Sequence, residues 1–129
     1  MSTPHQWSSA SDVLRYMAEN IPFEPEWPDG THDIAVTATM PDGDTPLHFA
    51  CAWGDLKAVE LLVLAGAPID KMGDMSITPL GTAVSGGHVE IAAFLLKHGA
   101  SPFAQSEFGA TPYQQASNGS AAMRAIFSA

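Results

Sequence analysis

The dipeptide Thr-Pro occurs four times, and three of the copies follow one another at a constant spacing. This periodicity constrains the fold more than any other feature of the sequence. These three copies begin at Thr45, Thr78 and Thr111, which are 33 residues apart. Small residues keep the same step, at Ala50, Ala83 and Ala116, at Gly54 and Gly87, and at Gly66 and Gly99. A period of this length is typical of proteins built from stacked structural repeats. We therefore expect a stack of similar units.

Each Thr-Pro has the features of a helix start. A threonine hydroxyl can accept a hydrogen bond from a free N–H of the first turn, and proline is well tolerated at the first helical position. The pattern predicts a first helix over about residues 46–53 and a second over about 56–65, with the next second helix over about 89–98. Gly66 and Gly99 fall where a left-handed residue ends a helix.

The first unit carries a specific motif, Gly43-Asp44-Thr45-Pro46-Leu47-His48-Phe49-Ala50, which resembles the signature of the ankyrin repeat. The segments after Gly66 and Gly99 resemble the end of each ankyrin unit. The resemblance covers about residues 34–129. It implies an all-α, ankyrin-repeat solenoid of stacked antiparallel helix pairs with β-turn fingers, in which the fingers and first helices form a concave binding face.

The domain organisation follows from the step. We expect units over about 34–66, 67–99 and 100–129, the last a truncated C-terminal cap. Residues 1–33 are expected to form an irregular N-terminal capping segment, with an amphipathic helix over 12–21 and a proline-rich stretch after it. Ser9 or Ser11 could cap this helix.

The signature histidine is present only in the first unit. His48 is replaced by Gly81 in the second unit and by Gln114 in the third. The resemblance implies that this histidine ties neighbouring loops together through side-chain hydrogen bonds. We therefore expect the loops of the later units to be less braced.

The charge is strongly acidic and unevenly distributed. The net charge is −9, and residues 17–55 contain eight carboxylates and no Lys or Arg. This balance argues against general binding of nucleic acid and against adhesion to anionic lipid, because both need clustered basic residues. Two interpretations stay open, a solvated surface and a contact surface for a basic protein.

Catalysis receives little support from the sequence. His48 belongs to the repeat signature, and Cys51 lies at a small helix position with no Lys or Arg near it in sequence. Phosphate-binding loops, nucleophile elbows and metal-ligand spacings are missing from the sequence. We expect no enzymatic activity, no cofactor or metal, and no small-molecule substrate. A single cysteine and no visible secretory signal or membrane-spanning run predict a cytoplasmic protein.

Partner contacts are expected at the fingers, at the ends of the first helices and in the N-terminal segment. Trp53 is either an aromatic anchor on the concave face or a packing residue against the N-terminal segment. Met75, Ile77 and Phe108 could form one apolar patch on neighbouring fingers. The candidate partner-binding residues are Trp53, Asp42, Asp44, Asp74, Met75, Ile77, Glu107, Phe108, Trp27, Glu24 and Glu26.

Three functions are compatible with these features. The leading hypothesis is a non-catalytic module that binds and blocks a basic protein, as an immunity protein neutralises a toxin. The alternative is a scaffold or regulatory subunit that docks a partner without inhibiting it. An enzyme using His48 or a pair of acidic residues is disfavoured.

Overall fold

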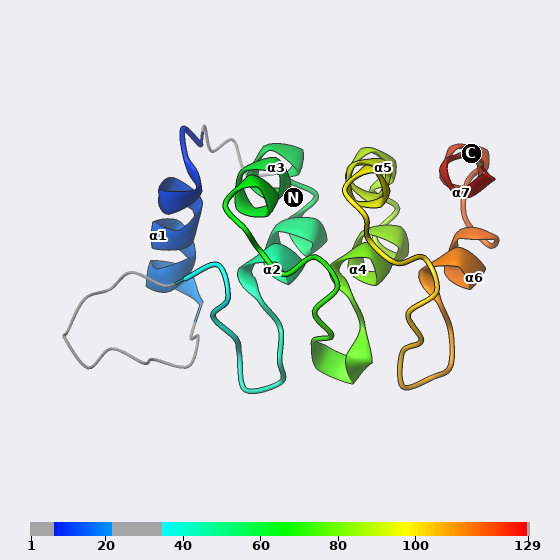
Figure 1. Ribbon diagram of the computed structural model, residues 1–129, viewed down its shortest axis with the longest axis horizontal. Coiled ribbons are helices and arrows are strands. Elements are labelled where there is room, and N and C mark those ends of the chain that lie inside the picture. The colour runs from blue at the N-terminus through cyan, green and yellow to red at the C-terminus, as the bar shows by residue number, and fades with distance from the viewer. Residues whose placement is uncertain (1–6, 22–34, 129) are drawn as a thin grey trace.

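The computed structural model describes residues 7–21 and 35–128, and within them it is helical with no strand. Figure 1 shows the helices in successive pairs preceded by one further helix, with loops that project on one side as fingers. The helices are α1 (Ala10–Asn20), α2 (Pro46–Trp53), α3 (Leu56–Leu64), α4 (Pro79–Ser85), α5 (Val89–Lys97), α6 (Pro112–Ala116) and α7 (Ala121–Ser128), with a short 3-10 turn, η1 (Asp74–Ser76), in the second finger.

The Thr-Pro steps start the first helix of each pair, as the sequence predicts. The hydroxyls of Thr45, Thr78 and Thr111 accept hydrogen bonds from the backbone N–H of the residue three positions later. These threonines are buried, so each hydroxyl satisfies a backbone donor that would otherwise have no partner. The Thr-Pro repeat therefore corresponds to a repeated helix start, one in each unit.

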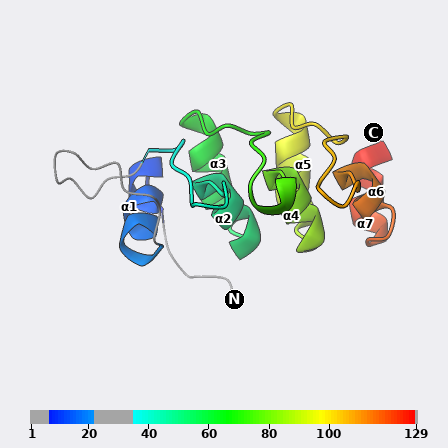
Figure 2. The same cartoon turned by 90° about the horizontal axis from the view of Figure 1, so that it is seen from below.

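The helices form two rows. In the inner row α2 packs against α4, and α4 packs against α6; in the outer row α3 packs against α5, and α5 packs against α7. Ala50, Ala83 and Ala116 lie at the buried positions of the inner row and allow its helices to approach closely. Figure 2 shows the two rows from below, at a right angle to the first view.

Helix α1 packs against α3, so it occupies the end of the outer row. It is seen from the side in Figure 1, whereas the paired helices are seen nearly end-on. Ser9 is its N-cap and accepts a hydrogen bond from the backbone of Asp12, and Val13 and Met17 are buried. The helix begins two residues earlier than the sequence predicted. The proline-rich stretch expected after it lies largely outside the described residues.

The third pair is shorter than the others. Helix α6 has 5 residues, whereas α2 has 8 and α4 has 7. Leu47, Leu80 and Tyr113 are equivalent in the repeat; the two leucines are fully buried, but the tyrosine is 47% exposed. The outer surface of this pair is therefore only partly covered.

Candidate protein-binding face

The three fingers share one turn geometry. In the first finger the N–H of Met40 bonds the carbonyl of Asp44, and the N–H of Gly43 bonds the carbonyl of Met40. The same two bonds recur in the second finger between Gly73, Ser76 and Ile77, and in the third between Ser106, Gly109 and Ala110. Backbone hydrogen bonds therefore set the shape of all three loops.

The second finger reaches this shape with less suitable residues. Gly43 and Gly109 have φ values of 100° and 81°, in the left-handed region that glycine adopts without a steric penalty. Ser76, the equivalent residue of the second finger, has a φ of 59°, and Met75 before it has a φ of 57°. Two consecutive non-glycine residues in this region store backbone strain in the second finger.

His48 joins the first unit to the second finger. Its Nδ1 accepts a hydrogen bond from the backbone N–H of Thr45 at 3.1 Å, and its Nε2 lies 2.8 Å from the carbonyl oxygen of Ile77. Since Nδ1 accepts, the ring proton must be on Nε2, which donates to that carbonyl. The implied role of the signature histidine, tying loops together, is therefore confirmed for His48.

The neutral form of His48 is favoured by its surroundings. The side chain is 3% exposed, and burial lowers its pKa below the usual value of 6.5. The hydrogen bond to Ile77 and the carboxylates of Asp44 and Asp42 oppose this change but do not cancel it. A protonated ring would also turn Nδ1 into a donor that faces the N–H of Thr45.

The later units replace parts of this arrangement. Gln114 keeps half of it, because its side-chain oxygen accepts from the N–H of Thr111 at 3.0 Å. Gly81 has no side chain, so the second unit sends no such link to the third finger. That finger is instead joined to the second by a backbone hydrogen bond from Glu107 N–H to Met75 O at 2.9 Å. The expected weaker bracing is thus partly offset by the backbone.

Among the candidate acidic residues, Asp44 has a structural use. Its Oδ1 accepts from the backbone N–H of Asp74 at 2.8 Å and so joins the first two fingers, and the residue is half-buried. Asp42, Asp74 and Glu107 are exposed on the three fingers. Asp42 also accepts the backbone N–H of Asp44 at 3.0 Å through its Oδ1, within its own finger. All three carboxylates nevertheless stay exposed to a partner, whereas Asp44 is mainly a brace between fingers.

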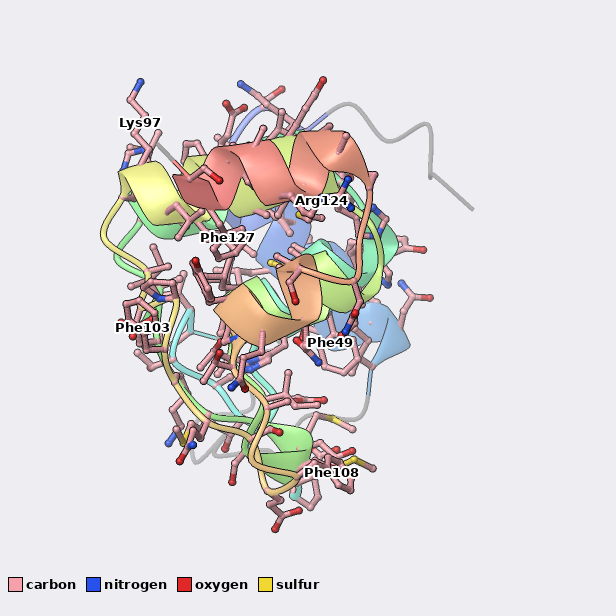
Figure 3. All side chains as sticks on the ribbon, turned by 90° about the vertical axis from the view of Figure 1, so that its right-hand side faces the viewer. Phe49, Lys97, Phe103, Phe108, Arg124 and Phe127 are labelled. Atoms are coloured by element: carbon pink, nitrogen blue, oxygen red, sulfur yellow. The ribbon has the colours of Figure 1, made fainter. Side chains whose placement is uncertain are left out.

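The apolar candidates differ in exposure. Met75 is 45% exposed and Phe108 is 75% exposed, and they lie on fingers that are hydrogen-bonded to each other. Ile77 is half-buried at the base of the second finger. Figure 3 places Phe108 at the finger end and Phe103 on the other side of the molecule, so these two phenylalanines do not belong to one patch.

Trp53 packs against the N-terminal segment. Its ring makes an edge contact with Tyr16 of α1 at a centroid distance of 5.8 Å, and Tyr16 contacts Trp7 at 5.6 Å. The indole N–H of Trp7 donates to the carboxylate of Asp55, the N-cap of α3, at 2.6 Å. Of the two expectations for Trp53, the structure shows the packing contact, and the ring stays half-exposed. Trp27, Glu24 and Glu26 lie outside the described residues.

The described residues offer no other chemistry of note. Among them, no group of three His, Cys, Asp or Glu side chains could hold a metal ion. Burial raises the pKa of the Cys51 thiol, which makes a thiolate nucleophile unfavourable there. None of the helices in this part of the chain is both long and apolar enough to cross a bilayer.

Comparison with known proteins identifies the family. A model of ankyrin repeats matches residues 5–106 with three copies. The chain belongs to the ankyrin-repeat family. The match also extends over α1. The boundary between the N-terminal capping segment and the repeats, at residues 33 and 34, stays a prediction. Ankyrin repeats form protein-interaction domains, and the chain is accordingly a protein–protein interaction module.

Several curated ankyrin-repeat proteins are similar to this chain. Human protein phosphatase 1 regulatory subunit 27 is 35% identical over 82 residues, which are 64% of this chain and 53% of that protein. Mouse 2-5A-dependent ribonuclease is 36% identical over 85 residues, 65% of this chain and 12% of that protein. Human B-cell lymphoma 3 protein is 39% identical over 84 residues, 61% of this chain and 18% of that protein. The chain therefore spans about half of the first relative and a small part of the others.

Proposed function

We propose that the finger face binds a protein with a basic surface and blocks that protein's activity, in the manner of an immunity protein. The observation that carries the proposal is the charge of the finger turns. Residues 40–44, 73–77 and 106–110 contain Asp42, Asp44, Asp74 and Glu107 and no Lys or Arg. Three of these carboxylates are exposed, and such a one-signed surface attracts a positively charged partner and speeds the encounter.

Exposed apolar residues supply the second element of such an interface. Charges steer association, but buried anchors supply most of the affinity in protein interfaces. Met75 and Phe108 stand beside Asp74 and Glu107 on the second and third fingers, and both are exposed. We infer that they are covered in the complex while the carboxylates contact basic side chains around them.

A second function is favoured by one of the relatives. The similar human protein is by its name a regulatory subunit of protein phosphatase 1. By analogy, this chain would bind an enzyme and regulate or localise it without inhibiting it. Both functions use the same face and both are non-catalytic, so they differ only in what binding does to the partner.

The test is to isolate the partner from the native source with the intact chain and with a variant that lacks three finger charges. The variant carries Asp42→Asn, Asp74→Asn and Glu107→Gln; Asp44 is left intact because it braces the fingers. We expect a basic partner that the variant recovers poorly. A saturating amount of this protein should then abolish the partner's activity if it blocks, and leave it unchanged if it only docks. A partner without a basic surface would overturn the proposal.

A further inference from the structure

The end of the stack beyond α6 and α7 exposes side-chain positions that are buried in the first two units. Tyr113 is 47% exposed where the equivalent residues of the first two units are fully buried leucines. The seventh residue of the outer helix is Leu62 in α3 and Leu95 in α5, both fully buried, whereas in α7 it is the half-buried Phe127. The third unit therefore presents two aromatic rings at positions that are covered in the rest of the stack.

A further helix pair covers the corresponding surface of each preceding unit. Helices α4 and α5 pack on α2 and α3, and α6 and α7 pack on α4 and α5. Figure 1 shows no described helix beyond α6 and α7. The ends of repeat stacks usually have a polar outer face. Here, instead, the ring centroid of Tyr113 lies 5.6 Å from that of Phe103 and 6.1 Å from that of Phe127. Three contacting aromatic rings are typical of a surface that packs against another protein segment.

A hollow of about 130 Å³ opens among these side chains. It is lined by Tyr113, Ala116, Ser117, Arg124, Phe127 and Ser128, and together with Phe103 these residues make up a surface that we call the end face. An apolar cavity of about 150 Å³ can hold a benzene ring. The hollow therefore has room for one apolar side chain of about that size, such as that of phenylalanine or leucine.

Arg124 gives the end face a positive charge. It is the single charged residue of α6 and α7, and its side chain is exposed. Its guanidinium donates to the carbonyl of Gly119 at 2.5 Å and, within the part of the chain that the structure describes, forms no ion pair. A guanidinium has five N–H donors and binds carboxylates best. The group that covers the end face should therefore bring a carboxylate beside its apolar side chain.

The same charge disfavours a second copy of this chain as the occupant. Two end faces in contact would place two Arg124 side chains in one interface, and neither α6 nor α7 contains an Asp or Glu that could pair with them. Like charges repel, and a buried unpaired charge is costly. The charge therefore points to a partner that is acidic where it meets Arg124.

We propose that the end face binds a helix of a partner protein, which places an apolar side chain in the hollow and a carboxylate on Arg124. A helix fits because helices cover the equivalent surfaces of the first two units. Arg124 and Phe127 lie one turn apart on α7, so the two partner side chains should also be one turn apart, at positions i and i+4. This contact goes beyond the proposed finger function and uses a different surface: Figure 3 looks onto the end face, where Phe127 lies well apart from Phe108 at the finger end.

The test uses a helical peptide of about 16 residues, rich in Ala and Gln, with one Phe and one Glu four positions apart. We expect saturable shifts of the backbone amide NMR signals of Ser117, Arg124 and Phe127, with the finger signals unchanged. The same peptide with Gln in place of Glu should bind about fivefold more weakly, and with Lys more weakly still. The peptide with Ala in place of Phe should bind about tenfold more weakly.

Two protein variants separate the charge from the rest of the surface. Arg124→Gln should bind the Glu and Gln peptides equally. Arg15→Gln is the matched control, because it removes an exposed positive charge from α1, at the other end of the stack, and it should keep the preference for Glu. If Arg124→Gln does not fold, Ser117→Phe, which fills the hollow from an exposed position, must abolish binding of the Phe–Glu peptide.

Other outcomes overturn the inference. Shifts that do not saturate, a Lys peptide that binds as tightly as the Glu peptide, or a preference for Glu that persists in Arg124→Gln would each show that the end face does not bind such a helix. End-face signals that move when the chain alone is diluted would show that a second copy covers this surface instead. The triple finger variant should bind the Phe–Glu peptide as the unaltered chain does, so either proposal can fail without the other.

Discussion

The Nε2 atom of His48 lies 2.8 Å from the carbonyl oxygen of Ile77, so a side chain of the first unit holds the backbone of the second finger. The same ring accepts the N–H of Thr45, and it is buried. One residue thus fixes a helix start and the neighbouring loop together, although 29 positions separate it from Ile77.

Removing this ring should destabilise the stack. His48→Ala leaves the N–H of Thr45 and the carbonyl of Ile77 without their partner, and a buried unsatisfied group costs about 1–3 kcal/mol. We expect a loss of that size in the free energy of unfolding, measured by urea denaturation. His48→Gln, which can restore one bond as Gln114 does, should lose less. An unchanged stability in His48→Ala would contradict the assigned role.

The lowered pKa of His48 predicts a pH dependence. In the unfolded chain the imidazole takes up a proton near its usual pKa of 6.5, whereas the folded state resists protonation until lower pH. Stability from this residue is therefore complete above about pH 6.5 and is lost as the pH falls towards the folded pKa. Thermal unfolding of the wild type should weaken between about pH 7.5 and 5.5 more than that of His48→Gln. Equal changes in both would contradict this.

Relieving the strained finger should stabilise the protein. Ser76 has a φ of 59° where the other fingers have glycine, and a left-handed residue costs about 1 kcal/mol. We expect Ser76→Gly to raise the free energy of unfolding by about 0.5–1 kcal/mol, after the entropy that glycine adds to the unfolded chain. Ser117, with a φ of −64°, provides the control, and Ser117→Gly should lower stability. A loss in both variants would refute stored strain at Ser76.

The contact between Trp53 and Tyr16 should appear as an energetic coupling. Aromatic pairs of this edge geometry contribute about 0.5–1.5 kcal/mol beyond burial. A double-mutant cycle with Trp53→Ala and Tyr16→Ala, followed by chemical denaturation, should give a coupling in this range. Additive losses would mean that α1 is not held by this pair.

The sequence predicts the structural features that follow the 33-residue step and those that depend on neighbouring residues. The helix starts at Thr45, Thr78 and Thr111 depend on residues within one turn, so the step of 33 locates them to within a residue. The strain at Ser76 could also have been found by the step, because positions 43 and 109 are both glycine.

Contacts that do not follow the 33-residue step could not be predicted from the sequence. Tyr16 meets Trp53 from a helix that no repeat spacing locates, and the bond from Trp7 to Asp55 joins residues 48 positions apart.

If exposed finger carboxylates attract a basic partner, the association rate constant must fall as the salt concentration rises. At low salt, the triple variant Asp42→Asn, Asp74→Asn, Glu107→Gln should associate about tenfold more slowly and show a flatter salt dependence. The matched control removes the same charge from α1, α3 and α5 by Glu19→Gln, Glu60→Gln and Glu90→Gln, and should change the rate less than about threefold. Equal rates for the two variants, or an association rate that does not change with salt, would show that the finger carboxylates do not attract the partner.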